Sequence, residues 1–285
     1  MADRPVLCCL PQETFDLIER TLAKEKIRAV HTTERTLLAT PREPALAAMI
    51  YQPRRDDLHT GLLVVRHWTN LYPNRPLVLC FPGPIGGRAD SLSSLNHFSG
   101  VVPWMTDAEI SPQGAAEIAA LVARLLAMAP EFLVRALVRL VSPQLTPAVT
   151  AFREALLDRL RTGGTSAPTP STLAAASQFP LWRIQRACRK AGLPPPERLV
   201  EWLTLIYVLA RADWEEISIA QAAARSEISD KYLRRLRSRL LPGVPRLSAR
   251  QAGDILVRAI VTFAQEAKLP AERAREIAQR LSYRA

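Results

Sequence analysis

The chain has 285 residues, of which 48% are hydrophobic, and it carries a formal net charge of +11. This length allows two domains with cores of their own, and the basic balance favours a polyanionic partner, although an arginine-favouring codon composition would give the same surplus. No stretch is apolar enough for a signal peptide or a membrane span, so we expect a cytoplasmic protein with no membrane contact.

Cysteine and histidine positions argue against a disulfide framework and against a zinc site. Cys8 and Cys9 are adjacent, no two cysteines have CxxC spacing, and the four histidines are scattered. We therefore expect buried, reduced thiols, no metal and no cofactor. We also expect no enzyme, because no Ser/His/Asp, Cys/His or paired-carboxylate constellation stands out.

Residues 1–128 alternate short apolar runs with longer amphipathic ones. The short runs predict strands at residues 6–10, 27–31, 45–51, 77–81 and 100–105, and the amphipathic runs predict helices at 12–25, 58–71 and 114–128. In the first helix, Phe15, Ile18 and Leu22 follow the i, i+3, i+7 spacing of a buried stripe. This alternation predicts an α/β domain with a parallel sheet and helices on both faces.

In element order and length, residues 1–128 resemble the receiver domain of response regulators. Receivers place acidic residues after the first strand, an aspartate after the third, Thr or Ser after the fourth and Lys-Pro at the fifth. Those places hold Pro11-Gln12-Glu13, Gln52-Pro53, Phe81-Pro82 and Val102-Pro103 here, and no lysine or acidic pair supports Asp56 and Asp57. Phosphoryl transfer needs such groups, so we expect an atypical receiver-like domain that is not phosphorylated. The alternative is a generic α/β domain that dimerises or binds a signal.

Residues 129–163 are expected to form a helical connector with helices at 131–140 and 147–161. Each has one apolar stripe, Phe132 to Leu140 in the first and Phe152 to Leu160 in the second. The stripes either carry a dimer interface or pack on their own domain. Residues 164–170, within TGGTSAPTPS, are expected to form a linker.

Residues 171–241 hold two copies of one pattern, in which a short alanine-rich helix, a tight break and an arginine-studded helix follow one another. The copies span residues 172–191 and 219–241, and an apolar helix at 197–211 lies between them. In the second basic helix, Leu233, Leu236 and Leu240 form a buried stripe and Ser229 is the expected N-cap. In the first, Ile184 and Cys188 belong to the inner face. This is the layout of a helix-turn-helix.

These stretches resemble the double helix-turn-helix domain of AraC/XylS-type transcription regulators. The matching segments are LAAAS (173–177), RIQRACRKAGL (183–193), ERLVEWLTLIYVLA (197–210) and SIAQAAARSEISDKYLRRLRSRLL (218–241). At the two turns, where the family usually has glycine, this chain has Gln178 and Glu227. Pro180 stands where a capping serine is common in the family. The expected fold is thus a receiver-like α/β N-terminal domain plus an all-α double helix-turn-helix domain at residues 171–245.

The resemblance implies that each basic helix enters a major groove, with the two grooves roughly 10 base pairs apart. The candidates for base-edge contacts are Trp182, Arg183, Arg186, Lys231, Arg234 and Arg235, and the candidates for phosphate or sugar contacts are Gln185, Arg189, Ser229 and Ser238. For each arginine the alternative is a solvated helix face, and for Trp182 it is packing against a neighbouring helix. Residues 171–245 hold twelve Lys and Arg against seven Asp and Glu, with the acids mostly on the connecting helix.

The resemblance implies a sequence-specific, DNA-binding transcription regulator of bacterial origin, with double-stranded DNA as its partner. RNA polymerase is a further candidate partner, and a homodimer would form through the N-terminal domain or residues 129–163. Glu227 and Asp230 near the second basic helix favour the alternative, a protein-interaction adaptor that no longer reads DNA.

Residues 246–285 lie beyond the resemblance and predict two more helices, at 249–268 and 271–281. This C-terminal extension either caps the DNA-reading domain or contacts a partner.

Overall fold

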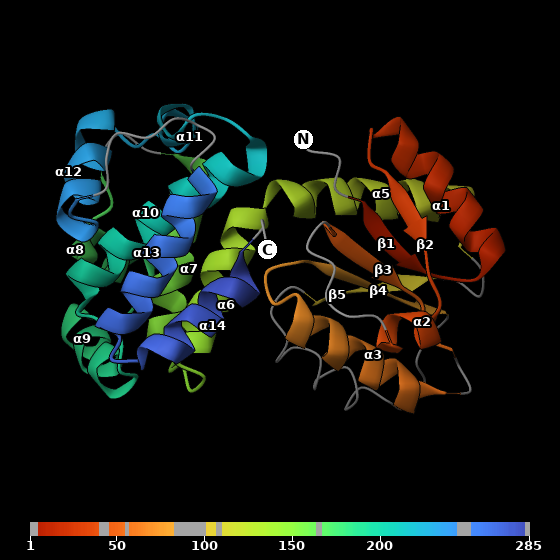
Figure 1. The fold of residues 1–285 in the computed structure, drawn as a ribbon, viewed down its shortest axis with the longest axis horizontal. Coiled ribbons are helices and arrows are strands. Elements are labelled where there is room, and N and C mark those ends of the chain that lie inside the picture. The colour runs from red at the N-terminus through yellow and green to blue at the C-terminus, as the bar shows by residue number, and fades with distance from the viewer. Residues whose placement is uncertain are drawn as a thin grey trace. The chain divides into compact units, whose positions relative to one another are not determined.

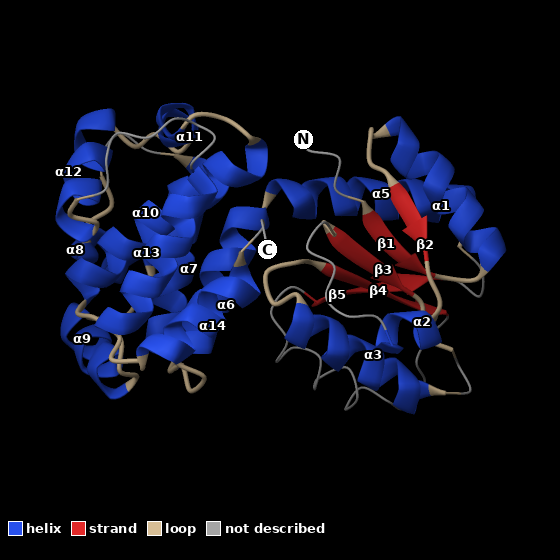
Figure 2. Cartoon of the chain, in the orientation of Figure 1, coloured by secondary structure: helices blue, strands red, loops and turns tan. Residues whose placement is uncertain are grey.

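The computed structural model describes residues 5–39, 46–54, 57–82, 101–106, 110–163, 167–243 and 252–282. The chain forms two compact units, Met1–Phe132 and Leu133–Ala285. Figure 2 shows the strands gathered in the first unit and helices throughout the described part of the second. The expected combination of an α/β domain with a helical domain is therefore confirmed.

The first unit is built on a parallel sheet of five strands in the order β2-β1-β3-β4-β5. The strands are β1 (Val6–Cys9), β2 (Ala29–His31), β3 (Ala48–Tyr51), β4 (Leu77–Pro82) and β5 (Val101–Thr106). In the register, Val6 pairs with Ala29 on one side and with Ala48 on the other. Every residue of β1 and β3 is buried, as expected of parallel strands that are covered on both faces. The predicted parallel sheet is confirmed.

Two helix pairs cover the sheet (Figure 1). Helices α1 (Gln12–Lys24) and α5 (Pro112–Ala127) pack together, and α2 (Glu34–Ala39) packs against α3 (Leu58–Leu71) on the other side. Helix α1 buries Phe15, Ile18 and Leu22, as its spacing predicts. Complete burial of one such side chain stabilises the fold by roughly 1.5–3 kcal/mol.

Helix α2 was not predicted from the sequence. It has six residues and one of them, Leu37, is buried, so it shows no helical periodicity. Its local signal is the cap at its start, where the Thr33 hydroxyl accepts a hydrogen bond from the Thr36 amide at 3.2 Å.

The helical unit is organised around α10 (Pro196–Glu215), which is buried on almost all sides. It contacts α7 (Pro147–Thr162), α8 (Pro170–Ala176), α9 (Leu181–Lys190), α11 (Ile219–Arg225), α12 (Asp230–Leu240) and α13 (Ala252–Glu266). A helix that is apolar all round is buried in the centre of a domain, and the run from Trp202 to Ala210 has this character. The central helix therefore fixes all four helices of the two copies.

Helix α7 belongs to this helical unit, since it packs against α8 and α9. Its apolar stripe, which includes Phe152, Leu156 and Leu160, is buried inside the unit. Of the two alternatives for that stripe, packing on its own domain is the one the structure contains. Helix α6 (Ala129–Val141) spans the division between the two units.

The expected linker at residues 164–170 is corrected at its C-terminal end. Thr169 is the N-cap of α8 and Pro170 is the first residue of that helix. Proline and threonine are characteristic of helix starts as well as of linkers, and this explains the misassignment. The segment joins α7 and α8 of one unit and does not separate two domains.

The C-terminal helices α13 and α14 (Ala271–Leu281) are part of the helical unit. The Trp202 ring of α10 meets the Phe263 ring of α13 edge to face, at 6.1 Å between centroids. Glu266 of α13 accepts hydrogen bonds from Trp202 Nε1 at 2.7 Å and from Arg198 Nε at 2.9 Å. Of the two alternatives for this extension, capping the domain is the one that these contacts support.

Candidate nucleic-acid interface

The two copies of the helix pair are built in the same way. Each opens with a capping box, at Thr169 for α8 and at Ser218 for α11. The second helix of each pair then starts after Pro180 in α9 and after Ser229 in α12. Corresponding residues are 49 positions apart in both cases (218 − 169 and 229 − 180). The chain therefore contains an internal repeat in structure as well as in sequence.

The two turns also match in backbone conformation. Gln178 has φ 60° and Glu227 has φ 52°, in the left-handed region that favours glycine. The residue after each turn closes it with the same hydrogen bond, from Phe179 N to Ala174 O at 3.3 Å and from Ile228 N to Ala223 O at 2.9 Å. This is the six-to-one bond of a Schellman cap. Both turns therefore place a non-glycine residue in the left-handed region.

Replacement of Gln178 by glycine is expected to stabilise the helical unit by about 1 kcal/mol, because a non-glycine residue pays a steric penalty in the left-handed region. Gln178 is exposed, so its side chain contributes little packing. Gln178→Ala is the matched control, since alanine keeps the penalty. Chemical denaturation of both variants checks the prediction, and equal stability of the two would contradict it.

The inner faces of the two basic helices are apolar and buried, as predicted. Helix α9 buries Ile184 and Cys188, and α12 buries Leu233, Leu236 and Leu240. All four cysteines of the chain are free and buried. Burial raises the pKa of the Cys188 thiol to about 12, so this side chain serves as a small apolar group and not as a nucleophile.

The outer faces carry all ten candidate DNA-contacting residues, and each of them is exposed: Trp182, Arg183, Gln185, Arg186 and Arg189 on α9, then Ser229, Lys231, Arg234, Arg235 and Ser238 at α12. Figure 1 shows α9 and α12 on the same outer margin of the helical unit, at the left of the view. Trp182 is 63% exposed. Trp182 is therefore not packed against a neighbouring helix, which was the alternative for this residue.

Acidic residues of α10 pair with arginines behind the outer faces. Glu201 forms an ion pair with Arg239 of α12, and Glu215 pairs with both Arg211 and Arg225. The acids that the sequence placed on the connecting helix thus neutralise cations next to that helix.

The cations on the outer faces are mostly left without acidic partners. Within the described parts of the chain, no ion pair forms at Arg186, Arg189 and Lys190 of α9 or at Lys231 and Arg235 of α12. The two basic helices therefore present uncompensated positive charge to solvent, as a polyanion-binding surface requires.

Three of the candidate residues already have intramolecular contacts. Arg234 forms an ion pair of 2.5 Å with Asp230, one turn earlier in α12. The Arg183 guanidinium lies 5.0 Å from the centre of the Phe179 ring. Ser229 is the predicted N-cap, and its hydroxyl accepts from the Tyr232 amide at 3.2 Å. These three side chains already make contacts within the protein, whereas Arg186 and Arg235 form no ion pair with any described residue.

A tyrosine and a carboxylate meet at the carboxyl edge of the sheet. The Tyr51 hydroxyl at the end of β3 donates a 2.5 Å hydrogen bond to Glu34 of α2. Burial, together with that bond, raises the pKa of Tyr51. Asp57 caps α3 by accepting from Thr60 N at 3.0 Å and from Thr60 Oγ1 at 2.6 Å, and these bonds lower the pKa of Asp57. Asp56 lies outside the described residues.

No three His, Cys, Asp or Glu side chains come together as a metal site anywhere in the described ranges. The same ranges contain no helix that is both long and apolar enough to cross a membrane.

Comparisons of the chain with protein-family models, with curated proteins and with solved structures found no match.

Proposed function

We propose that the protein is a sequence-specific DNA-binding transcription regulator that reads two successive major grooves with α9 and α12. The major groove of B-DNA, roughly 12 Å wide, admits one α-helix. The observation that carries the proposal is the repeated helix pair, with its uncompensated cations on the exposed faces of the two basic helices. A chain that only needed a soluble surface would have no reason to repeat this arrangement on one central helix.

Equivalent positions in the repeat suggest equivalent roles. Arg186 and Arg235 are 49 positions apart (235 − 186), and both are exposed and unpaired. An arginine fork can donate two hydrogen bonds to O6 and N7 of guanine, or clamp a phosphate. We assign the central contact in each groove to these two arginines, and we assign Trp182 and Lys231, another equivalent pair, to the start of each reading helix.

The N-terminal unit is proposed to be a receiver-like domain that works without phosphorylation. The strand order β2-β1-β3-β4-β5 supports this relationship, because it is the doubly wound order that receivers share with flavodoxins. Tyr51 and Glu34 bond to each other at the edge where phosphoryl chemistry would need a metal and a free aspartate. RNA polymerase and a second copy of the chain, through this unit, remain proposed partners.

Selection from a random duplex library at two salt concentrations tests the proposal with the full chain. The expected product is two short half-sites about one helical turn apart, roughly 10 base pairs. Retention without a motif that disappears at modest salt would instead show polyelectrolyte attraction alone.

The second candidate function is a protein-interaction adaptor with the same helical fold. The observation in its favour is the Asp230–Arg234 ion pair, which places a carboxylate at the start of α12 and neutralises one candidate reading residue. A carboxylate there repels phosphates but stabilises the helix dipole. Two results together would favour the adaptor: retention without a motif in the selection, and unchanged duplex binding by the variant Arg186→Glu/Arg235→Glu.

A further inference from the structure

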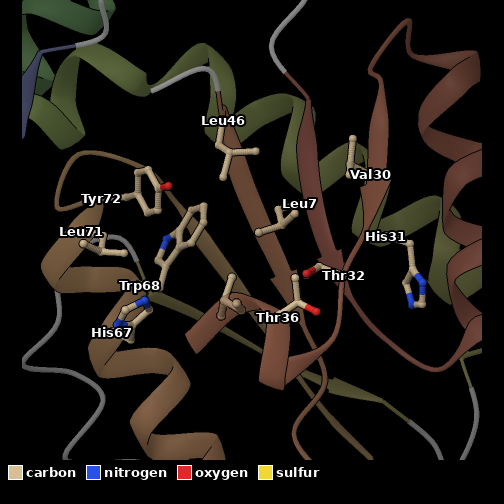
Figure 3. Close-up of a pocket in the computed structure, with 11 residues that line it drawn as sticks. Leu7, Val30, His31, Thr32, Thr36, Leu46, His67, Trp68, Leu71 and Tyr72 are labelled. Atoms are coloured by element: carbon tan, nitrogen blue, oxygen red, sulfur yellow. The ribbon is translucent and has the colours of Figure 1, made fainter. Parts of the chain in front are cut away.

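The α/β unit contains a cavity of about 180 Å³ between the sheet and the α2–α3 layer. Figure 3 shows His67 and Trp68 entering it from α3, with Leu7 of β1 and Val30 of β2 on the opposite side. Leu37 of α2 also lines it. Most of its wall is therefore apolar.

Two polar atoms of the α3 wall are buried without a hydrogen-bond partner. Trp68 has no exposed surface, and its Nε1 bonds to nothing in the described ranges. The same holds for Nε2 of the neighbouring residue, His67. Buried donors in folded proteins are almost always paired, because a buried donor without a partner has lost its hydrogen bonds to water and gains nothing in return. A cavity beside an unpaired donor is thus an arrangement that a ligand would complete.

The size and lining of the cavity define the class of ligand. An apolar cavity of about 150 Å³ accepts benzene, so this one accommodates a single ring with a short substituent. No lysine or arginine lines the cavity, and an unpaired charge is costly in an apolar site. A neutral molecule with one hydrogen-bond acceptor for Trp68 Nε1 matches both conditions.

A route from solvent exists beside the edge strand β2. Val30 lines the cavity and is 38% exposed. The ligand therefore reaches the cavity without unfolding of the sheet.

We propose that the cavity lined by Trp68 and His67 binds a small neutral one-ring compound with a carbonyl-type acceptor, held by a hydrogen bond from Trp68 Nε1. This site is separate from the DNA-reading helices, and its existence does not depend on the proposed function.

The test follows the indole N–H signals of the full chain by nitrogen–proton NMR without DNA. Acetophenone is the probe, and α-methylstyrene is its shape-matched control because a methylene group replaces the carbonyl oxygen. We expect acetophenone to shift the Trp68 indole signal saturably and to bind about fivefold more tightly than α-methylstyrene, as one net hydrogen bond implies. The Trp68→Phe variant assigns the signal, because the signal is absent from it. In that variant the backbone N–H signals around the cavity should show equal binding of the two compounds.

Trp182→Phe is the matched variant, since Trp182 is exposed and lies in the other unit, and it should leave the fivefold preference unchanged. The wild-type titration stands even if Trp68→Phe folds poorly. Equal affinity of the wild type for the two compounds, or no saturable shift of the Trp68 signal with either, would overturn the proposal. Those outcomes would mean that water satisfies the two nitrogen atoms.

Discussion

Charge reversal of Arg186 and Arg235 together is expected to weaken binding to the selected duplex by about 100-fold. Each arginine is exposed and forms no ion pair within the described structure, so the substitution breaks no ion pair and the fold should persist. Loss of one good arginine contact costs roughly 1–3 kcal/mol, and two independent losses of about 1.4 kcal/mol each give this factor. Fluorescence anisotropy titrations of Arg186→Glu/Arg235→Glu at two salt concentrations measure the change.

The matched control is Arg258→Glu/Arg275→Glu, which changes the net charge equally on α13 and α14. Both control arginines are exposed and unpaired among the described side chains. If DNA binds α9 and α12, the control loses affinity only through long-range repulsion, which salt screens. Equal losses in the two double variants would point to diffuse attraction of the whole basic surface and would remove α9 and α12 from their assigned role.

Much of the fold could be predicted because burial leaves a periodic signal. The stripes of α1, α9 and α12 were predicted correctly from spacing alone, and the parallel sheet from its alternation with helices. Helix α2 could not be found by spacing, since six residues make less than two turns. The membership of α7 and α13 in the helical unit was equally hidden, because a long-range contact such as Trp202 with Phe263 has no local pattern.

The candidate site, like the fold, could be predicted from the sequence only in part. Which residues face outward followed from helical spacing, and all ten candidates are exposed. Helical spacing could not show which cations are neutralised, because ion pairs such as Arg239 of α12 with Glu201 of α10 join different helices. The Asp230–Arg234 pair has the i, i+4 spacing of a helix ion pair, and this signal would have ranked Arg235 above Arg234 as a DNA contact. The turn residues Gln178 and Glu227 were visible as departures from a family pattern, but their left-handed conformation required the structure.

Replacement of Trp202 by alanine is expected to lower the free energy of unfolding of the helical unit by about 4 kcal/mol. Trp202 has no exposed surface, contacts the Phe263 ring and donates a 2.7 Å hydrogen bond to Glu266. Its removal leaves a cavity between α10 and α13 and an acceptor that has lost one donor. Native-state hydrogen exchange of the α10 amides measures the loss within this unit, independently of the sheet.

Trp182→Ala supplies the matched control, since 63% of Trp182 is exposed and a surface substitution costs within about 0.5 kcal/mol. The two tryptophans should separate stability from binding: Trp182→Ala weakens DNA binding in a folded protein, whereas Trp202→Ala acts on DNA binding only through a loosened α10. Trp202→Phe keeps the ring and should fall between the wild type and alanine. If Trp202→Ala cost no more stability than Trp182→Ala, α13 would not be packed on α10, and the C-terminal helices would be an appendage rather than part of the scaffold that holds α9 and α12.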